Sequence, residues 1–200
     1  MFLSTPSRRL AVLASVATAW IAASAHAGIL GGPIVNPANG YSYYILTESS
    51  WTAAQAEAVS LGGHLVTIRN AAENQWIFDT FAAFGGVDRN LWIGMNDVAV
   101  DGTFVWVNGD PVTYTNWAPG EPNNGGGGQA EQYAHMWAAN QGFGSLRTPG
   151  TWNDAINDPN PILAIFAIPT PFYGVVEVIP EPAAASLLLP AAMLLRRRPR

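Results

Sequence analysis

The stretch that decides the expected fold is residues 51–77, "WTAAQAEAVSLGGHLVTIRNAAENQWI". Ser50 precedes it as a helix N-cap, and the apolar residues that follow repeat at helical spacing. They are Trp51, Ala54, Ala58 and Leu61. The pair Gly62-Gly63 ends this helix, since glycine disfavours its continuation. Residues 64–68, "HLVTI", then have the branched composition of a short strand.

A second helix is expected directly after this strand. Asn70 and Glu73 have the spacing of a capping box, which marks a helix start. The residues expected on its buried side are Trp76, Ile77, Thr80, Phe81 and Phe84. The pair Gly85-Gly86 ends this helix as well.

The remaining apolar segments predict strands. They are "YSYYIL" (41–46), "LWIGM" (91–95), "TFVWVNG" (103–109), "VTYTNW" (112–117) and "YGVVEV" (173–178), divided by Asn, Asp and Gly turns. Two early helices followed by strands and loops indicate an α+β fold. The sequence contains no cysteine, so disulfides cannot stabilise this fold.

The first 27 residues have the layout of a secretory signal peptide. Arg8 and Arg9 precede an apolar run, and the run ends in Ala25-His26-Ala27, which offers small residues for cleavage. A transmembrane anchor fits less well, because the run is short for a bilayer span. We expect signal peptidase to remove residues 1–27.

Residues 179–200 also differ from the rest of the chain. The turn Pro180-Glu181-Pro182 is followed by an apolar stretch at 183–195 and by arginines at 196–200. This ending resembles the PEP-CTERM sorting tail of exopolysaccharide-producing bacteria. The resemblance implies recognition by an exosortase, transient anchoring in the inner membrane, and release to the cell surface or extracellular matrix.

Between these ends lies one domain, residues 28–178, with a strongly acidic balance. It has no lysine, and three arginines stand against thirteen acids, which gives a formal charge of −10. Such a domain repels nucleic acid and anionic lipid. It attracts a divalent cation if its acids converge.

The domain resembles the C-type lectin-like family over nearly its whole length. Residues 51–77 match that family's first helix, strand and second helix, "LWIGM" its core signature, and "DGTFVWVNG" (101–109) the following hairpin. "EPN" (121–123) and "WND" (152–154) then follow in the family's order, on the segments that carry its sugar site. The resemblance implies two helices flanking short antiparallel sheets, with a long loop region.

The resemblance also implies a calcium site. The residues that match its ligands are Glu121, Asn123, Glu131, Asn153 and Asp154. Calcium prefers six to eight hard oxygens, which carboxylates and amide carbonyls supply. We expect Pro122 to follow a cis peptide bond that turns its neighbours to one side. The glycines at 125–128 would let the chain return so that Glu131 reaches the ion.

Sugar binding would use four of the same side chains. In the family, two vicinal hydroxyls complete the calcium coordination, and each exchanges hydrogen bonds with one acid and one amide. Glu121 with Asn123 would serve one hydroxyl, and Glu131 with Asn153 the other. In similar proteins the Glu-Pro-Asn order accompanies mannose- and glucose-type sugars.

Two departures from the family favour another function. Ala58, Val176 and Tyr133 stand where the family's usual cysteines would lie, and the apolar segment 161–172 is longer than a compact member needs. That segment is either a core strand or an exposed patch for another protein.

The sequence thus predicts an exported bacterial lectin that binds mannose- or glucose-type glycan or exopolysaccharide through Ca2+. The alternative is a structural or adhesive matrix protein that uses the fold to bind protein without sugar. We find no pairing of nucleophile with base and no phosphate-binding loop, so we expect no enzyme activity.

Overall fold

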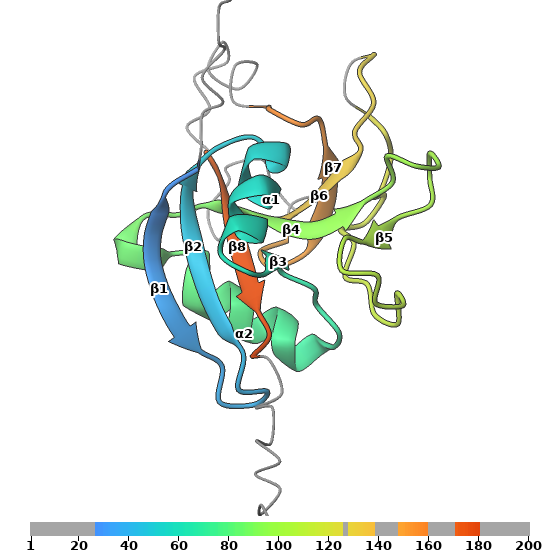
Figure 1. Cartoon of the computed structure of the whole chain (residues 1–200). Helices are drawn as coiled ribbons and strands as arrows, with labels where there is room; N and C mark the ends of the chain where they lie inside the picture. Colours follow the sequence, from blue (N-terminus) through green and yellow to red (C-terminus); the bar gives the residue numbers. More distant parts are fainter. Residues whose placement is uncertain (1–26, 126–127, 139–147, 160–170, 181–200) are drawn as a thin grey trace, which may run out of the picture.

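The computed structural model describes residues 27–125, 128–138, 148–159 and 171–180 (Figure 1). The expected signal peptide apart from Ala27, most of the apolar segment 161–172, and Glu181 and Pro182 of the sorting motif lie outside these residues. None of the helices in the described ranges has the length and apolar character needed to cross a membrane.

The strands described form one mixed sheet. Its main path runs in the order β1-β2-β8-β4-β6-β7, while β3 pairs with β8 and β5 with β4. The strands are β1 Ile29–Val35, β2 Ser42–Glu48, β3 His64–Leu65, β4 Asn90–Asn96, β5 Val105–Trp106, β6 Tyr133–Met136, β7 Trp152–Ala155 and β8 Phe172–Val178. The pairings are antiparallel except that of β4 with β8, which is parallel. The expected α+β class is confirmed, with a single mixed sheet joining the strands.

Both expected helices are present, and polar side chains cap their starts. They are α1 (Trp51–Ser60) and α2 (Ala71–Phe81), and a short 3-10 turn, η1 (Phe84–Gly86), follows the second. The Ser50 side chain accepts a hydrogen bond from the Ala53 amide, and Asn70 Oδ1 accepts one from the Glu73 amide at 2.9 Å. Glu73 departs from a capping box, because its Oε2 atom accepts from the Arg69 amide instead of the Asn70 amide.

Aromatic side chains centre the core on Trp152. This residue is fully buried, and the rings of Trp106, Tyr114 and Trp117 pack edge-on against it at centroid distances of 5.7 to 5.8 Å. Its indole N–H donates to Asn74 Oδ1 at 2.7 Å, which satisfies the one polar atom of the side chain. This hydrogen bond joins β7, which carries Trp152, to α2, which carries Asn74.

Packed side chains occupy the positions where the family resemblance placed cysteines. Ala58 on α1 and Val176 on β8 are both fully buried in a second core cluster. Tyr133 stacks against Trp51 with ring centroids 4.7 Å apart. Apolar contacts thus join α1 to the sheet in a chain without cysteine.

Gly94, the fourth residue of "LWIGM", lets β3 approach β4. A Cβ atom at this position would clash with the Leu65 carbonyl oxygen. The Gly94 amide instead donates to the Val66 carbonyl at 2.8 Å. The glycine of this signature is therefore required by backbone contact between two strands.

Two strand assignments from the sequence differ from the structure. Residues 112–117 were expected to form a strand but do not, and only Trp117 forms an isolated bridge, with Trp152. Tyr114 in this segment packs on the Trp152 ring, which explains its apolar character without strand pairing. Conversely, β1 has little strand signal because glycines and Pro33 interrupt it, and it exists through pairing with β2.

Candidate functional site

The residues expected at the calcium site come from three segments that the fold brings together. Glu121 and Asn123 lie on the loop between β5 and β6, Glu131 lies just before β6, and Asn153 and Asp154 lie on β7. β6 and β7 pair directly. Backbone hydrogen bonds of 2.8 Å join Trp152 to residues 116 and 118 and hold the loop beside β7.

Asp154 fastens the loop to β7. The residue is 1% exposed, and its two carboxylate oxygens accept hydrogen bonds from the amides of Asn123 at 3.2 Å and Asn124 at 2.8 Å. The Glu121–Pro122 peptide bond is cis, the isomer expected from the sequence. The loop carrying "EPN" therefore has a defined position relative to the "WND" strand.

Asn124 closes the other side of the loop. Its side-chain oxygen accepts from the Glu131 amide at 2.8 Å, and its φ of 51° is in the left-handed region that asparagine tolerates. Its amide nitrogen donates to Asp101 at 3.2 Å. Asn124 is not among the five ligands predicted from the sequence, although an asparagine before glycine is a recognisable turn signal.

Gly125 leaves room between two of the expected ligands. A Cβ atom there would clash with Asn123 Oδ1 and would lie 3.6 Å from Glu131 Oε2. The Gly125 backbone amide also hydrogen-bonds the Glu131 carboxylate. These contacts show that the Asn123 amide oxygen and the Glu131 carboxylate lie near one point, where a side chain is excluded.

The carboxylates of the site influence one another. Burial, and then the charge of Asp154, raise the pKa of Glu121 to about 7, and the same two causes raise the pKa of Glu131 to about 7. Glu121 Oε2 is buried without a hydrogen-bond partner among the described residues. The carboxylates of these acids thus lie close enough to repel one another, and hydrogen bonds offset that repulsion only in part.

No arginine of the described ranges neutralises this cluster. The arginines in those ranges are Arg69, which pairs with Glu177 and other acids, and Arg89, which donates to the carbonyls of Phe84 and Val87. The oxygen-rich set of two glutamates, one aspartate and two asparagines has the chemistry that a hard ion such as Ca2+ prefers.

The cluster is not a preformed metal cage. Across the described ranges, no three His, Cys, Asp or Glu side chains are grouped closely enough to hold an ion as they stand. Asp154 directs both oxygens at loop amides, and two of the five expected ligands are asparagines. The residue types present fit calcium in their chemistry, and calcium binding would compete with the hydrogen bonds that Asp154 accepts.

A buried histidine lies behind Asn153. His135 on β6 is the direct cross-strand partner of Asn153, and its Nε2 atom is 3.3 Å from Asn153 Nδ2. The ring is fully buried against Trp137 and Phe172, at centroid distances of 4.3 and 4.8 Å. Since an amide nitrogen is a donor, Nε2 is the acceptor in this contact, and the contact does not use Asn153 Oδ1. The register of β6 and β7 thus places a buried ring directly beside Asn153.

Comparison with known proteins gives a family and a shared fold. The family model described as "Lectin C-type domain" matches residues 47–156. The mouse low affinity immunoglobulin epsilon Fc receptor is 46% identical over 67 residues, 34% of this chain and 17% of the receptor. An alpha-N-acetylgalactosamine-specific lectin from Patiria pectinifera is 50% identical over 46 residues, 23% of this chain and 26% of that lectin. The chain thus spans well under two thirds of these relatives.

A solved structure matches a larger part of the chain. The C-type carbohydrate-recognition domain of cow CD23, crystallised in the presence of GlcNAc2Man3 oligosaccharide, aligns with a TM-score of 0.52 and 26% identity. The alignment covers 70% of this chain and 89% of that one. The likeness therefore extends over the helices and the sheet as one unit.

Proposed function

Because this chain belongs to the C-type lectin domain family, we propose that it is an exported protein that binds carbohydrate through calcium. The observation that carries the proposal is the position of the loop residues: Asn123 Oδ1 and the Glu131 carboxylate lie beside Gly125, and the Asp154 carboxylate accepts from the Asn123 amide. Burial, and then the charge of Asp154, raise the pKa values of Glu121 and Glu131 to about 7. Acids that repel one another in the metal-free protein gain most from a divalent cation. The family is not enzymatic in general, and we propose no catalytic activity.

The ligands proposed for Ca2+ are Glu121, Asn123, Glu131, Asn153 and Asp154. When bound, calcium would supply coordination positions for two neighbouring sugar hydroxyls. The carboxylates of Glu121 and Glu131 accept hydrogen bonds from those hydroxyls, and the amides of Asn123 and Asn153 donate to them. Each hydroxyl is thus held by one acceptor and one donor.

The sugar class rests on the order of these groups along the loop. Glu121-Pro122-Asn123 is the order that goes with mannose- and glucose-type sugars in similar proteins. The relatives are associated with different sugars. One is named as specific for alpha-N-acetylgalactosamine, and the cow CD23 domain was crystallised in the presence of the GlcNAc2Man3 oligosaccharide. These relatives support carbohydrate as the ligand class, and the proposal of mannose or glucose rests on the loop.

Export and sorting form the second part of the proposal. The tail at 179–200, with Pro180-Glu181-Pro182, supports a bacterial origin, processing by an exosortase, and a passing attachment to the inner membrane before release. Removal of residues 1–27 would place the new amino terminus at Gly28, whose nitrogen lies 2.8 Å from Thr47 Oγ1. The expected final location is the cell surface or extracellular matrix.

One observation favours the adhesive alternative. Hydrogen bonds within the protein hold the loop: Asp154 accepts from the amides of Asn123 and Asn124, and Asn124 Oδ1 accepts from the Glu131 amide. A loop held in this way could present a surface to a protein partner without any sugar.

A glycan array and calorimetry together test the proposal. Wild-type protein should bind mannose- or glucose-terminated glycans in calcium and lose that binding in chelator. Glu131→Gln should weaken both calcium and glycan binding, whereas Glu48→Gln, an exposed acid at the end of β2, should leave both unchanged. Tight calcium binding without any glycan binding would favour the adhesive function, and glycan binding that persists in chelator would contradict the calcium mechanism.

A further inference from the structure

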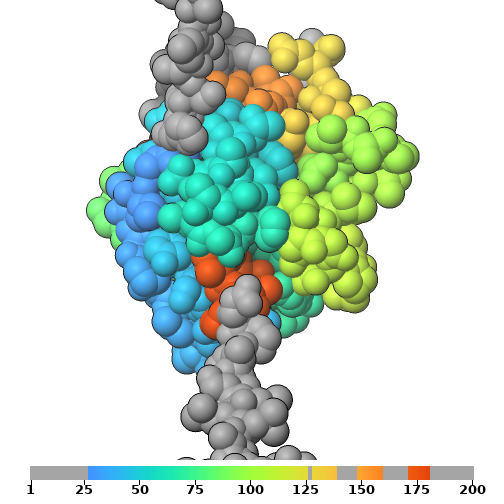
Figure 2. Space-filling model, viewed as in Figure 1, coloured from blue at the N-terminus to red at the C-terminus, as the bar shows by residue number. Residues whose placement is uncertain are grey.

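A cleft lies at the opposite edge of the sheet from the candidate calcium site. β1 and β7 form the two ends of the strand order. The cleft lies between the β1–β2 turn and the start of α2, and it encloses about 310 Å3. In Figures 1 and 2 the blue β1 and β2 lie on the left of the molecule, and the green and yellow loop region that follows β5 lies on the right. The residues that matter here are Asn36, Tyr41, Asn70, Ala72 and Trp76.

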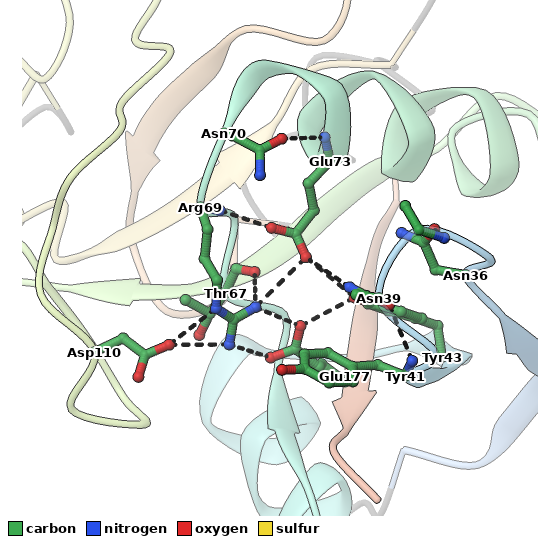
Figure 3. Close-up of polar contacts among 11 residues, drawn as sticks. Asn36, Asn39, Tyr41, Tyr43, Thr67, Arg69, Asn70, Glu73, Asp110 and Glu177 are labelled. Atoms are coloured by element: carbon green, nitrogen blue, oxygen red, sulfur yellow. Dashed lines mark hydrogen bonds and ion pairs between the residues drawn. The ribbon is translucent and has the colours of Figure 1, made fainter.

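A partly buried ionic network forms one wall of this cleft, which Arg69 and Glu73 line (Figure 3). Arg69 pairs with both oxygens of Glu177 at 2.8 and 2.9 Å and with Asp110 at 2.9 Å. Glu73 accepts from the Arg69 amide at 2.8 Å and from the Tyr43 hydroxyl at 3.1 Å. These charges are paired within the protein, so the wall is rigid and presents no unpaired ion to a ligand.

The net charge of the network disfavours anionic ligands, and a cation of the protein itself already lies on the aromatic face of Tyr41. One guanidinium stands against the carboxylates of Glu73, Asp110 and Glu177, so the formal balance is negative. The Arg69 guanidinium also lies over the Tyr41 ring, 5.6 Å from its centroid, so a cation already uses that aromatic face. A neutral ligand meets neither obstacle.

The groups left for a ligand are neutral donors and aromatic surface. Asn36 Oδ1 accepts from the Ala38 amide and Asn70 Oδ1 from the Glu73 amide, both at 2.9 Å. These bonds orient the two side chains, and no hydrogen bond within the described residues occupies their amide nitrogens. Trp76 packs on Tyr43 at 4.9 Å and is partly buried, so the rest of its surface lines the cleft.

We propose that this cleft is a second, calcium-independent site for a neutral pyranose of the β-glucose type. An all-equatorial ring has an apolar C–H face to stack on Trp76, and ring substituents that accept hydrogen bonds from the amide nitrogens of Asn36 and Asn70. Concave sites with aromatic walls and a few fixed polar groups bind such ligands. Two sites at opposite edges would let one chain bridge two glycan strands. This bridging rests on the proposed function of the calcium site, whereas sugar binding in the cleft does not depend on that function.

The test uses the purified full chain in chelator, so that calcium-dependent binding cannot contribute. Nuclear magnetic resonance titrations with cellobiose, methyl β-glucuronoside and choline compare a neutral, an anionic and a cationic probe. Ala72→Gln places a longer side chain in the cleft, and Ala71→Gln is its matched control, because Ala71 is exposed on the same helical turn and does not line the cleft. Tyr41→Ala is a second variant that removes one aromatic wall.

Cellobiose should shift the Trp76 indole signal in wild type and in Ala71→Gln, and bind about tenfold more weakly to both cleft variants. The glucuronoside and choline should not bind. Binding of choline alone, equal cellobiose binding by all variants, or no binding in chelator would each overturn the proposal. In the last case, cellobiose binding restored by calcium would still support the calcium site, which separates the two proposals.

Discussion

The change Glu131→Gln should stabilise the metal-free protein and remove most of its stabilisation by calcium. Burial and the Asp154 charge raise the pKa of Glu131 from 4.5 to about 7, so at pH 8 its ionised form opposes folding. The full shift corresponds to about 3.4 kcal/mol as an upper limit. Glu131 remains partly exposed, and solvent screening reduces this to about 1 kcal/mol. For a domain of this size, metal-free Glu131→Gln should melt about 2 to 4 °C higher than wild type.

Calcium should reverse that order. At a hundredfold excess over its dissociation constant, a ligand specific to the folded state stabilises wild type by about 2.7 kcal/mol, or roughly 5 to 11 °C. If the loss of the Glu131 charge weakens affinity about a hundredfold, the same calcium concentration stabilises the variant by only about 0.4 kcal/mol. The variant should therefore melt higher than wild type in chelator and lower in calcium.

Differential scanning calorimetry at pH 8 in chelator, calcium and magnesium measures all three values. Glu48→Gln is the control, since it removes an exposed acid away from the site, and it should behave as wild type throughout. Magnesium should stabilise far less than calcium because it prefers a smaller octahedral shell. The reasoning is refuted if Glu131→Gln destabilises the chelated protein, or if calcium raises both melting temperatures equally.

Three further outcomes are expected. Since the folded-state pKa values of Glu121 and Glu131 are raised from 4.5 to about 7, their contribution to metal-free stability is fully present below pH 4.5 and is lost as pH rises to about 7. Calorimetry in chelator should show this contribution to the melting temperature falling between about pH 4.5 and 7, and its absence from Glu131→Gln identifies it; an equal pH dependence in wild type and variant would contradict the clustering of these acids. The double change Glu121→Gln with Asn123→Asp should keep calcium binding but shift sugar preference from mannose toward galactose, because it exchanges the hydrogen-bond acceptor and donor. Calorimetry with monosaccharides measures this preference, and an unchanged preference would exclude these groups from sugar contact. Trp152→Phe should lower the free energy of unfolding, measured in urea, by about 3 kcal/mol, because it leaves a cavity and removes the donor to the buried Asn74 amide oxygen. A decrease of less than about 1 kcal/mol would show that the site is not anchored through this ring.

The sequence by itself determined the features that depend on neighbouring residues. Ser50 and Asn70 cap the two helices where expected, because a side chain that reaches a backbone amide three residues on needs no distant partner. The residue types of the candidate calcium site and their order along the chain were also predicted from the sequence. Their positions in space were not.

Tertiary structure alone decided how distant segments meet. β1, with its glycines and proline, is a strand only because β2 pairs with it, and His135 faces Asn153 only through the register of β6 and β7. The partners of Asp154 are loop amides about thirty residues earlier in the chain, and the cleft joins the 36–41 turn to the start of α2. Pairing, register and burial are set by the packing of the whole sheet, so no local pattern in the sequence contains them.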